Sequence, residues 1–522
     1  MRPIDYFDKG AAANPDRAAI VGDGISYTYR EAHAASERIA RAMWASGLEL
    51  GDRVAIYSPN DVRVLLATLG LLRAGASWIP INPRNALPAN AEFMNHVETG
   101  WLFYHSSFAD TVEEIRSCVP SLRHFVCLDA DDGANPSLET FMSGGGETDG
   151  IDWADAYGNP DHLVGLFPTG GTTGAAKAVR FSYLSWATMT ELGAHYWRCD
   201  DIDPVCLAVA PLTHAAGVVA MTMFSLGATN VIMPGFDAPE VLRNIERFRV
   251  THLFLPPTAF YALLAEPDVR SFDYSSLRAF LVAAAPISPD KLKEGIEVFG
   301  PCMCQCYGQV EAPMLLTALD QKTLAAAAAG DHPERLASCG KATYKVRIGI
   351  MDDDGRLLPP GERGEIVARS NLVNPGYYQN EAATAAIRAH GWHHTGDVGY
   401  RDEDGYFYIV DRKKDMIITG GFNVYSAEVE AGVLELPQVR ECAVVGVPDD
   451  HWGEAVKSIV VLKESESLTE RDVIAHCKAR LGGVKAPKSV EFWPELPKTP
   501  AGKVDKKAIR THYWAGSERA VH

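Results

Sequence analysis

The chain has 522 residues, a length that predicts two or more domains. Its formal net charge of −18 argues against a general nucleic-acid binder, because phosphate backbones are bound by basic surfaces. Hydrophobic residues make up 47% of the chain and charged residues 22%, the profile of a soluble globular protein. The N-terminus lacks the apolar stretch of a signal peptide, and the most apolar window, 215–228, is too short for a transmembrane segment, so we expect a cytoplasmic location.

The N-terminal region predicts a parallel sheet built from strand–helix–strand units. Thr28 can cap a helix that Gly47 ends, because a threonine hydroxyl accepts from the first helical N–H groups and glycine tolerates the turn that follows. A strand over 53–57, a helix over 64–72 and a strand over 77–81 come next. Strand, helix and strand at this spacing form a βαβ unit, which joins parallel strands.

The same alternation returns further along the chain. Strands are predicted at 251–255 and 277–283, with helices after Pro257 and Pro289. The polar, glycine-rich stretch 129–161 is predicted to be a loop. We therefore expect an α/β fold, with a large N-terminal domain of parallel-type sheets and packed helices.

Three cysteines, Cys302, Cys304 and Cys306, alternate along one segment. Alternation on a strand places all three on one face, which is compatible with a metal site. No CxxC pair or nearby cluster of ligands accompanies them. Buried free cysteines on a core strand are the favoured interpretation.

The pattern changes near residue 411. A charged run, 411–415, stands between two apolar strands; Ser426 can then cap a short helix and Thr469 a second one. Strands are predicted near 441–447 and 455–462. These elements indicate a compact α+β unit of domain size.

The predicted domains are therefore an N-terminal domain over 1–411 and a small C-terminal domain over 412–522. A charge run such as 411–415 is usually a solvated turn. Its place at the boundary favours a hinge.

A glycine- and threonine-rich segment, 167–177, follows an apolar strand and predicts a phosphate site. Glycines let backbone N–H groups approach an anion, threonine hydroxyls add donors, and a lysine adds charge. Two alanines separate the last glycine from the lysine, so the segment is not a kinase-type P-loop, which needs Gly-Lys-Ser/Thr in succession. A surface turn is the alternative. The candidate nucleotide-binding residues are Thr169, Gly170, Gly171, Thr172, Thr173, Gly174 and Lys177.

The segment resembles the phosphate loop of the adenylate-forming superfamily, which includes acyl-CoA synthetases, the adenylation domains of peptide synthetases, and firefly luciferase. Further motifs resemble that superfamily in its own order, and nearly the whole chain fits the family's length. They are Pro211–Gly217, Tyr307–Glu311, Trp392–Asp397, Asp411–Lys414, Gly420–Glu428 and Pro497–Lys503.

For the catalytic groups, the resemblance implies three roles. Lys503 would bridge the substrate carboxylate and the α-phosphate of ATP; a solvated surface lysine is its alternative. Glu311 would hold Mg²⁺, and a glutamate at a helix N-terminus is the alternative, which the sequence allows at the same time. His214 would lie beside the acyl pocket and the incoming thiol, or be a core histidine with satisfied hydrogen bonds.

For the nucleotide, the resemblance implies that Asp397 and Arg412 contact the ribose. A turn aspartate, and a hinge arginine paired with Asp411 or Asp415, are the alternatives. Tyr307, followed by a turn at Gly308, would stack on the adenine, or pack in the core. Ala285, in the stretch 283–286, would pass the edge of the base, or belong to a tightly packed strand.

Hinge and acceptor residues follow from the same resemblance. Lys414 would be the pivot on which the small domain rotates between adenylation and thioester formation. Gly420 and Gly421 would line the passage of the CoA pantetheine arm, where glycine leaves room. Two positions depart from the family pattern: Ala176 replaces a proline, and Val310 replaces a threonine whose hydroxyl donates to the α-phosphate or acyl-adenylate.

The predicted function is an acyl-CoA ligase that uses ATP, Mg²⁺ and CoA to activate a hydrophobic carboxylic acid, fatty or aryl, through acyl-AMP. Small side chains over 215–220 suggest a roomy apolar pocket for that acid. The rivals are an enzyme that loads a carrier-protein thiol, a luciferase-like oxygenase, and a non-catalytic nucleotide or acyl binder. The expected partner is a small carboxylic acid, with no nucleic acid and no transmembrane segment; a homo-oligomer is left open.

Overall fold

The computed structural model describes residues 1–145, 162–169, 176–419, 422–449, 452–499 and 503–514. The described chain divides into two compact units. Unit 1 holds most of residues 1–348 together with 368–393, and unit 2 holds residues 349–367 and most of 394–522. The hinge predicted at 411–415 lies inside unit 2, and the boundary predicted there stays a prediction.

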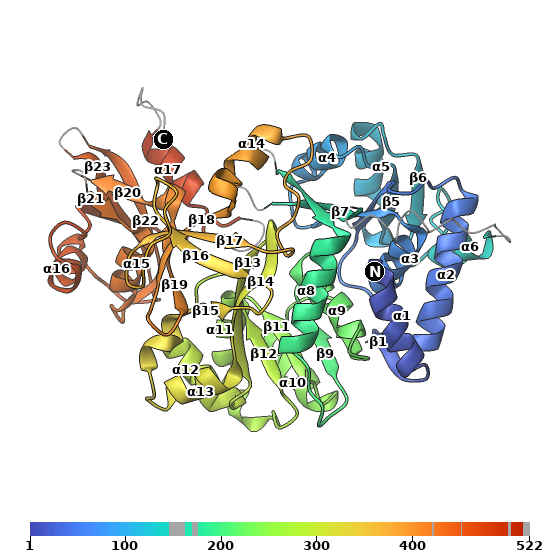
Figure 1. Ribbon diagram of the computed structural model, residues 1–522, viewed down its shortest axis with the longest axis horizontal. Helices are drawn as coiled ribbons and strands as arrows, with labels where there is room; N and C mark the ends of the chain where they lie inside the picture. The colour runs from blue at the N-terminus through green and yellow to red at the C-terminus, as the bar shows by residue number, and fades with distance from the viewer. Residues whose placement is uncertain (146–161, 170–175, 420–421, 450–451, 500–502, 515–522) are drawn as a thin grey trace. The chain divides into compact units, whose positions relative to one another are not determined.

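Unit 1 contains a sheet made from the predicted βαβ pattern (Figure 1). Its strands are β3 (Arg53–Tyr57), β4 (Ser77–Pro80), β5 (Trp101–Tyr104), β6 (His124–Cys127), β7 (Leu163–Pro168) and β8 (Ala178–Ser182). Their order is β6-β5-β3-β4-β7-β8, and the pairs are parallel except β7 with β8. Helices α3 (Val62–Ala74), α4 (Leu87–His96) and α5 (Ala109–Cys118) connect the strands. Both faces are covered, and the strands are accordingly apolar along nearly their whole length.

A second sheet in unit 1 carries the predicted residues His214, Ala285, Tyr307, Gly308 and Glu311 on its strands or the segments that follow them. Its parallel strands are β9 (Val205–Ala208), β10 (Thr229–Ile232), β11 (His252–Leu255), β12 (Ala279–Val282) and β13 (Met303–Gln309). Strands β14 (Ala312–Leu319), β15 (Gly340–Ala342), β1 (Ala18–Gly22) and β2 (Ile25–Thr28) complete the order β15-β14-β13-β12-β11-β9-β10-β1-β2. Helices α9 (Ala215–Phe224), α10 (Ala238–Arg247), α11 (Pro257–Leu264) and α12 (Pro289–Phe299) connect the parallel strands.

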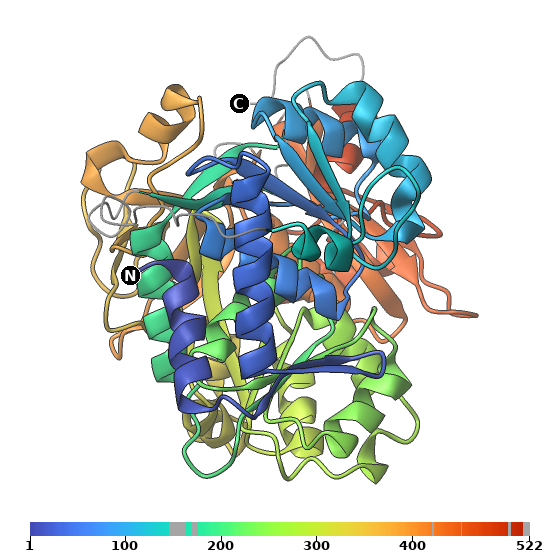
Figure 2. The ribbon, with the colours of Figure 1, turned by 90° about the vertical axis from the view of Figure 1, so that its right-hand side faces the viewer.

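The remaining helices of unit 1 cover these sheets. They are α1 (Pro3–Ala13), α2 (Tyr29–Ala45), α6 (Leu138–Ser143), α8 (Tyr183–Tyr196), α13 (Gln321–Ala328) and α14 (Glu381–Ala386). Helices α1 and α2 lie side by side (Figure 1; Figure 2). Thr28 caps α2 as predicted, since its hydroxyl accepts from the Glu31 backbone N–H, and the left-handed Gly47 follows the helix end.

Unit 2 is α+β. Strands β16 (Arg347–Met351), β17 (Gly364–Arg369), β18 (His393–Arg401) and β19 (Tyr406–Arg412) are neighbours in that order. The C-terminal sheet runs β21 (Phe422–Val424), β20 (Ile417–Thr419), β23 (Gly453–Leu462), β22 (Val439–Asp449), with β24 (Ser489–Phe492) paired to β23. Helices α15 (Ser426–Leu434), α16 (Glu470–Leu481) and α17 (Lys506–Trp514) pack with these strands. The predicted α/β class, with a large N-terminal and a smaller C-terminal domain, is confirmed.

Some local predictions were wrong. Ser426 is the first residue of α15 and not its cap; Tyr425 stands at the cap position. The stretch predicted as a loop contains α6, because Ser137 caps a helical turn there by accepting from the Thr140 N–H. Among the described residues, no helix is long and apolar enough to cross a membrane.

Candidate active site

The predicted phosphate loop lies between the two strands of a hairpin. Strands β7 and β8 are antiparallel, with Pro168 opposite Ala178. At the base, the Thr169 N–H donates to the Lys177 carbonyl at 3.0 Å, and the Lys177 side chain is exposed. The loop itself, with Gly170, Gly171, Thr172, Thr173 and Gly174, lies outside the described residues.

Three predicted residues lie along one edge of the second sheet. The carboxyl ends of parallel strands meet at a common edge, which is where open α/β sheets bind ligands. The register sets Leu253 opposite Leu207, Leu255 opposite Val282 and Leu281 opposite Cys304. The segments after β9, β11 and β12 therefore leave the sheet on the side toward which β13 continues to Tyr307. This edge therefore brings together His214, Ala285 and Tyr307.

The segment after β12 is strained and open. Ala283 is buried, whereas Ala284 and Ala285 are exposed. Ala284 has φ +77°, a left-handed conformation that costs an alanine roughly 1–2 kcal/mol. Exposure at Ala285 fits a surface that a flat base could approach, and it excludes the alternative of a tightly packed strand at that residue.

Gly308 is required by the close approach of β13 and β14. A side chain there would place its Cβ 2.5 Å from the Met314 backbone nitrogen and 2.7 Å from the Ala312 carbonyl oxygen. The ladder between the strands is irregular just there, between Tyr307 and Gln309. Tyr307 is buried, and Gly308 continues the strand instead of forming the predicted turn.

Glu311 lies in the two-residue turn between β13 and β14, beside Val310. The alternative of a glutamate at a helix N-terminus is therefore wrong. Glu311 Oε1 accepts from the Tyr377 hydroxyl at 2.6 Å. The turn is held by Asn374, whose side chain donates to the Val310 carbonyl at 2.7 Å and whose N–H donates to the Glu311 carbonyl at 2.8 Å.

Tyr377 is a site residue that the sequence analysis missed. Its ring lies under Lys177, with Nζ 4.8 Å from the ring centroid, while its hydroxyl binds Glu311. A bridge to Val179 on β8 fixes the backbone at this position. Burial and the Glu311 carboxylate raise the pKa of the Tyr377 phenol, so this group stays a hydrogen-bond donor at neutral pH.

His214 is exposed and stands at the cap position of α9, so the core-histidine alternative is wrong. The segment 209–212, which precedes His214, is held by Asn60. The Asn60 amide donates to the carbonyls of Val209 and Ala210 and accepts from the Leu212 N–H. Gly217 does not widen a pocket: a Cβ there would lie 1.9 Å from the Leu212 carbonyl oxygen. The smallness of Gly217 serves the packing of α9 on this segment.

Asp397 and Arg412 are opposite one another on β18 and β19. Arg412 Nε lies 2.6 Å from Asp397 Oδ1; the carboxylate is buried and the guanidinium is about half exposed. The alternative pairing of Arg412 with Asp411 or Asp415 is not what the structure shows. A carboxylate can accept hydrogen bonds from the two hydroxyls of a diol such as ribose, and the exposed N–H groups of a guanidinium can donate to them.

Lys503 lies near this ion pair, within unit 2. Partial desolvation and the Arg412 guanidinium lower the pKa of the Lys503 ammonium, and the Asp397 carboxylate opposes them. The Lys503 residue as a whole is exposed. The charges of Asp397 and Arg412 both act on Lys503, so the three predicted residues lie within electrostatic range of one another in unit 2.

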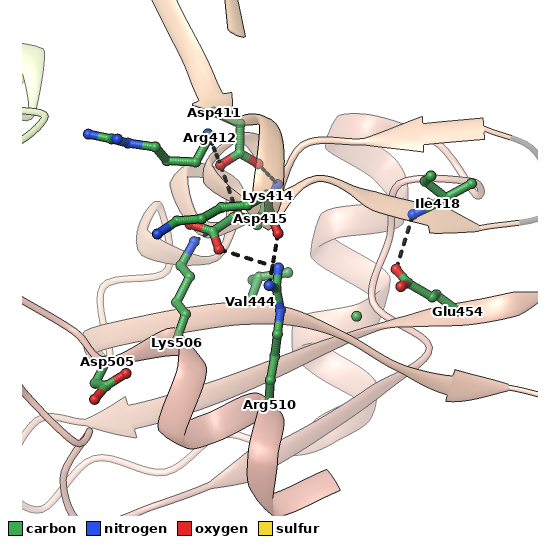
Figure 3. Close-up of polar contacts among 12 residues, drawn as sticks. Asp411, Arg412, Lys414, Asp415, Ile418, Val444, Glu454, Asp505, Lys506 and Arg510 are labelled. Carbon is green, nitrogen blue, oxygen red and sulfur yellow. Dashed lines mark hydrogen bonds and ion pairs between the residues drawn. The ribbon is translucent and has the colours of Figure 1, made fainter. Parts of the chain in front are cut away.

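The predicted hinge residues, 411–415, form a compact polar cluster with α17 (Figure 3). Lys414 is exposed, and its carbonyl accepts from Arg510 of α17 at 2.8 Å. Lys413 pairs with Asp353 at 2.7 Å and with Glu365 at 3.3 Å. Gly420 and Gly421 lie outside the described residues.

The alternating cysteines lie on or next to β13. Cys302 and Cys304 are buried and Cys306 is half-buried. Burial raises the pKa of each thiol, as expected for inert core residues. Among the described residues, no three side chains of the types His, Cys, Asp and Glu are grouped so that they could hold a metal ion.

One cavity of about 190 Å³ lies away from these groups. It is lined by Arg53 and Ser77, the first residues of β3 and β4, and by residues near the start of β7. That is the opposite end of these strands from the edge where α/β folds bind ligands. We therefore assign it no part in the site.

Comparison with known proteins identifies the family. Residues 7–378 match the AMP-binding enzyme family, and residues 428–503 match the AMP-binding enzyme C-terminal domain. The medium/long-chain-fatty-acid–CoA ligase FadD8 of Mycobacterium tuberculosis is 43% identical over 370 residues, 69% of this chain and 63% of that protein's length. A feruloyl-CoA synthase of Amycolatopsis is 33% identical over 96% of this chain and 97% of its own.

A solved structure agrees with these relatives. ATP-bound MatB from Rhodopseudomonas palustris has a TM-score of 0.87 and 30% identity, covering 98% of this chain and 99% of its own. The predicted class of enzyme, an ATP-dependent acid–CoA ligase using ATP, Mg²⁺ and CoA, is confirmed at the level of the family. The chain belongs to the AMP-binding enzyme family, in the acyl-CoA synthetase branch of the adenylate-forming superfamily.

Proposed function

We propose that this protein activates a hydrophobic monocarboxylic acid, fatty or aryl, and transfers its acyl group to CoA. In the first step a carboxylate oxygen attacks the α-phosphorus of ATP, forming acyl-AMP and releasing pyrophosphate. In the second step the CoA thiolate attacks the acyl carbon, forming the thioester and releasing AMP. Activation is needed because a carboxylate has no adequate leaving group, whereas AMP is one.

The observation that carries the proposal is the grouping of Asp397, Arg412 and Lys503 in unit 2. Asp397 accepts hydrogen bonds and Arg412 donates them at a place suited to the ribose. Lys503 supplies a positive charge beside them, where it would stabilise the carboxylate and α-phosphate as they approach. Such charge neutralisation and positioning supply most of the catalysis in phosphoryl and nucleotidyl transfer.

Unit 1 carries a second set of groups, to which the family resemblance gives roles toward the nucleotide and Mg²⁺. Lys177 and the hydroxyl-rich loop would bind the phosphates, and Tyr307 and Ala285 would contact the adenine. Glu311, oriented by Tyr377, would hold Mg²⁺, since carboxylate oxygens are the ligands that this ion prefers. The bound ion would neutralise charge on the departing pyrophosphate. Val310 provides no hydroxyl, so the loop threonines would supply that donor.

His214 would lie beside the acid and contribute to the choice of substrate. An exposed histidine at the start of α9 can meet both the acid and the incoming thiol. The relatives named above act, by their names, on fatty acids and on ferulate, and both are hydrophobic monocarboxylic acids. This similarity supports the substrate class and leaves the individual acid to experiment.

The test is a panel of fatty and aryl acids incubated with protein, ATP and Mg²⁺, with and without CoA. Mass spectrometry should show AMP and an acyl-CoA for at least one acid, and neither product without an acid. AMP without thioester in the presence of CoA would favour a carrier-protein acceptor. Nucleotide binding without turnover of any acid would contradict the proposal and favour a non-catalytic binder.

A further inference from the structure

Helix α17 begins three residues after Lys503 and carries two cations toward the predicted hinge. Lys506 and Arg510 are four residues apart, so they project from the same face of the helix. The close-up of unit 2 shows both side chains reaching the segment that contains Asp411, Lys414 and Asp415 (Figure 3). The adenylation lysine and the hinge are thus connected through one short helix.

Lys506 lies at the centre of a mostly buried polar network. Its Nζ is 2.7 Å from Glu430 Oε1 and donates to the Ser426 hydroxyl at 2.7 Å. Ser426 donates to Asp411 through its hydroxyl at 3.1 Å and also through its backbone N–H. Asp411 in turn accepts from the Arg412 N–H at 2.7 Å. The network runs from α17 through α15 to the first residue of the hinge.

Arg510 holds the other end of the hinge. It donates to the Lys414 carbonyl at 2.8 Å, and its guanidinium lies 3.4 Å from Asp415 Oδ1. Both partners of that ion pair are largely buried. Consecutive turns of α17 therefore hold the two ends of the segment 411–415.

Backbone hydrogen bonds in the segment just before α17 fix the position of Lys503. The Asp505 N–H donates to the Pro497 carbonyl at 2.8 Å, and the Thr499 N–H donates to the Lys503 carbonyl at 2.7 Å. The Lys503 N–H donates to the Thr499 hydroxyl at 3.3 Å. Since Lys506 comes three residues after Lys503 and directly after Asp505, a shift of the N-terminal end of α17 would move Lys503.

The charges of the network depend on one another. Burial raises the pKa of both Asp411 and Glu430. Burial opposes the charged form of Lys506, but the carboxylates of Glu430 and Asp411 raise the pKa of its ammonium. Removing the ammonium would leave two buried carboxylates without their compensating charge, which disfavours the present arrangement.

We propose that Lys506 is a positioning residue for adenylation: it ties the hinge at Asp411 to the start of α17, so that the hinge and the Lys503 turn move as one body. The inference rests on the proposed function of Lys503. Folding of this region does not depend on Lys506 alone, because Ile509 anchors the same helix in the core formed by Ala443, Val445 and Ile459. A variant lacking the ammonium should therefore keep α17 in place but loosen its N-terminal end.

The experiment compares Lys506→Met with Lys507→Met. Methionine keeps an unbranched apolar stem like that of lysine and removes the ammonium. Lys507 is the adjacent lysine and is exposed. Acid-dependent exchange of pyrophosphate into ATP should fall at least about tenfold in Lys506→Met, because small misplacement of a reacting group is costly. Transfer of the acyl group from supplied acyl-AMP to CoA should stay within about twofold of wild type, because it does not use Lys503. Lys507→Met should change neither rate, and Lys506→Arg should restore most of the exchange.

Hydrogen exchange gives a second readout that does not depend on activity. In Lys506→Met, the amides of Lys503, Thr499 and Ser426 should exchange faster than in Lys507→Met. Equal exchange and equal partial rates in the two variants would overturn the inference, and so would a parallel loss of both partial reactions. Absence of pyrophosphate exchange in the wild type with every acid would contradict the proposed function, whereas the amide comparison would still decide the role of Lys506.

Discussion

Tyr377 connects two groups that the sequence places far apart. Its hydroxyl donates to Glu311, and its ring makes a cation–π contact with the ammonium of Lys177. A hydrogen bond fixes the rotamer of the carboxylate, and the ring fixes the position of the cation at the base of the phosphate loop. If Glu311 holds Mg²⁺, Tyr377 sets where the ion and the phosphates meet.

Tyr377→Phe should therefore raise the Mg²⁺ concentration needed for half-maximal adenylation. Loss of a hydrogen bond to a charged acceptor costs about 1.5–3 kcal/mol, which corresponds to roughly a tenfold increase or more. The KM for the carboxylic acid should change little, because the ring and its contact with Lys177 remain. A Mg²⁺ titration of pyrophosphate exchange measures the Mg²⁺ dependence, and a titration of the acid at saturating Mg²⁺ measures its KM.

Tyr378→Phe is the matched control. The Tyr378 hydroxyl lies in a different cluster, accepting from Arg53 at 2.9 Å and bonding Glu98 at 3.2 Å. Its loss should leave the Mg²⁺ dependence as in wild type. The same Mg²⁺ dependence in the two variants would show that Tyr377 does not act through Glu311.

The sequence motif pointed to Glu311 as a functional residue, but it did not predict the hairpin turn on which Glu311 lies. The motif Tyr307–Glu311 pointed to Glu311, but the turn at Val310 and Glu311 lacks the Asn-Gly or Gly residues that mark a two-residue hairpin in a sequence. The turn forms instead because Asn374 holds both of its carbonyls. Contacts with residues more than sixty positions away leave no local signal, which is why Tyr377 and Asn374 were missed.

Among the elements, those with strong local signals were predicted correctly. Thr28 and Thr469 cap their helices, and proline begins α11 and α12. The prediction that Ser426 caps α15 was wrong because its hydroxyl and backbone N–H both donate to Asp411, fifteen residues earlier in the chain. A distant carboxylate thus replaced the local capping bond.

Strand β11 contains a buried titratable group. His252 Nε2 lies 2.6 Å from the Trp197 carbonyl, and Nδ1 lies 2.6 Å from the Thr251 hydroxyl. The carbonyl can only accept, so Nε2 carries the proton and Nδ1 accepts in the neutral ring. Burial lowers the pKa of His252 to about 4.

This depressed pKa makes unit 1 sensitive to mild acid. Below about pH 6.5 the unfolded chain binds a proton that the folded chain takes up only near pH 4, so stability falls as the pH decreases through this window. The total loss is roughly 3 kcal/mol at 1.36 kcal/mol per pKa unit. His252→Gln should therefore lose less in Tm between pH 7 and pH 5 than the wild type.

The exposed His96 serves as the control for this measurement. His96→Gln should show the same decrease in Tm between pH 7 and pH 5 as the wild type. If His252→Gln and His96→Gln lose stability to the same extent, the burial of an uncharged His252 does not govern the acid response.

For the whole molecule, alternating strands and helices predicted parallel sheets and a smaller C-terminal α+β region. The predicted position of His214, Ala285 and Tyr307 at the carboxyl edge of β9, β11, β12 and β13 follows from that topology. The grouping of Asp397 and Arg412 with Lys503 could not be derived from spacing, because it depends on the register of β18 with β19 and on the backbone hydrogen bonds that hold Lys503 and Asp505 before α17. The motif resemblance identified these residues, and the fold of unit 2 brings them together.

The central claim is that Lys503 supplies the charge for adenylation, and one measurement tests it most directly. Acid-dependent exchange of labelled pyrophosphate into ATP is compared in wild type, Lys503→Ala and Lys498→Ala, using the best acid of the panel. Lys498 belongs to the same segment, but its ammonium pairs with Glu441 at 3.0 Å. Loss of a preorganised electrostatic group costs about a hundredfold or more in rate, so Lys503→Ala should lose exchange by that factor while Lys498→Ala stays near wild type. Exchange by Lys503→Ala at the rate of Lys498→Ala would contradict the account.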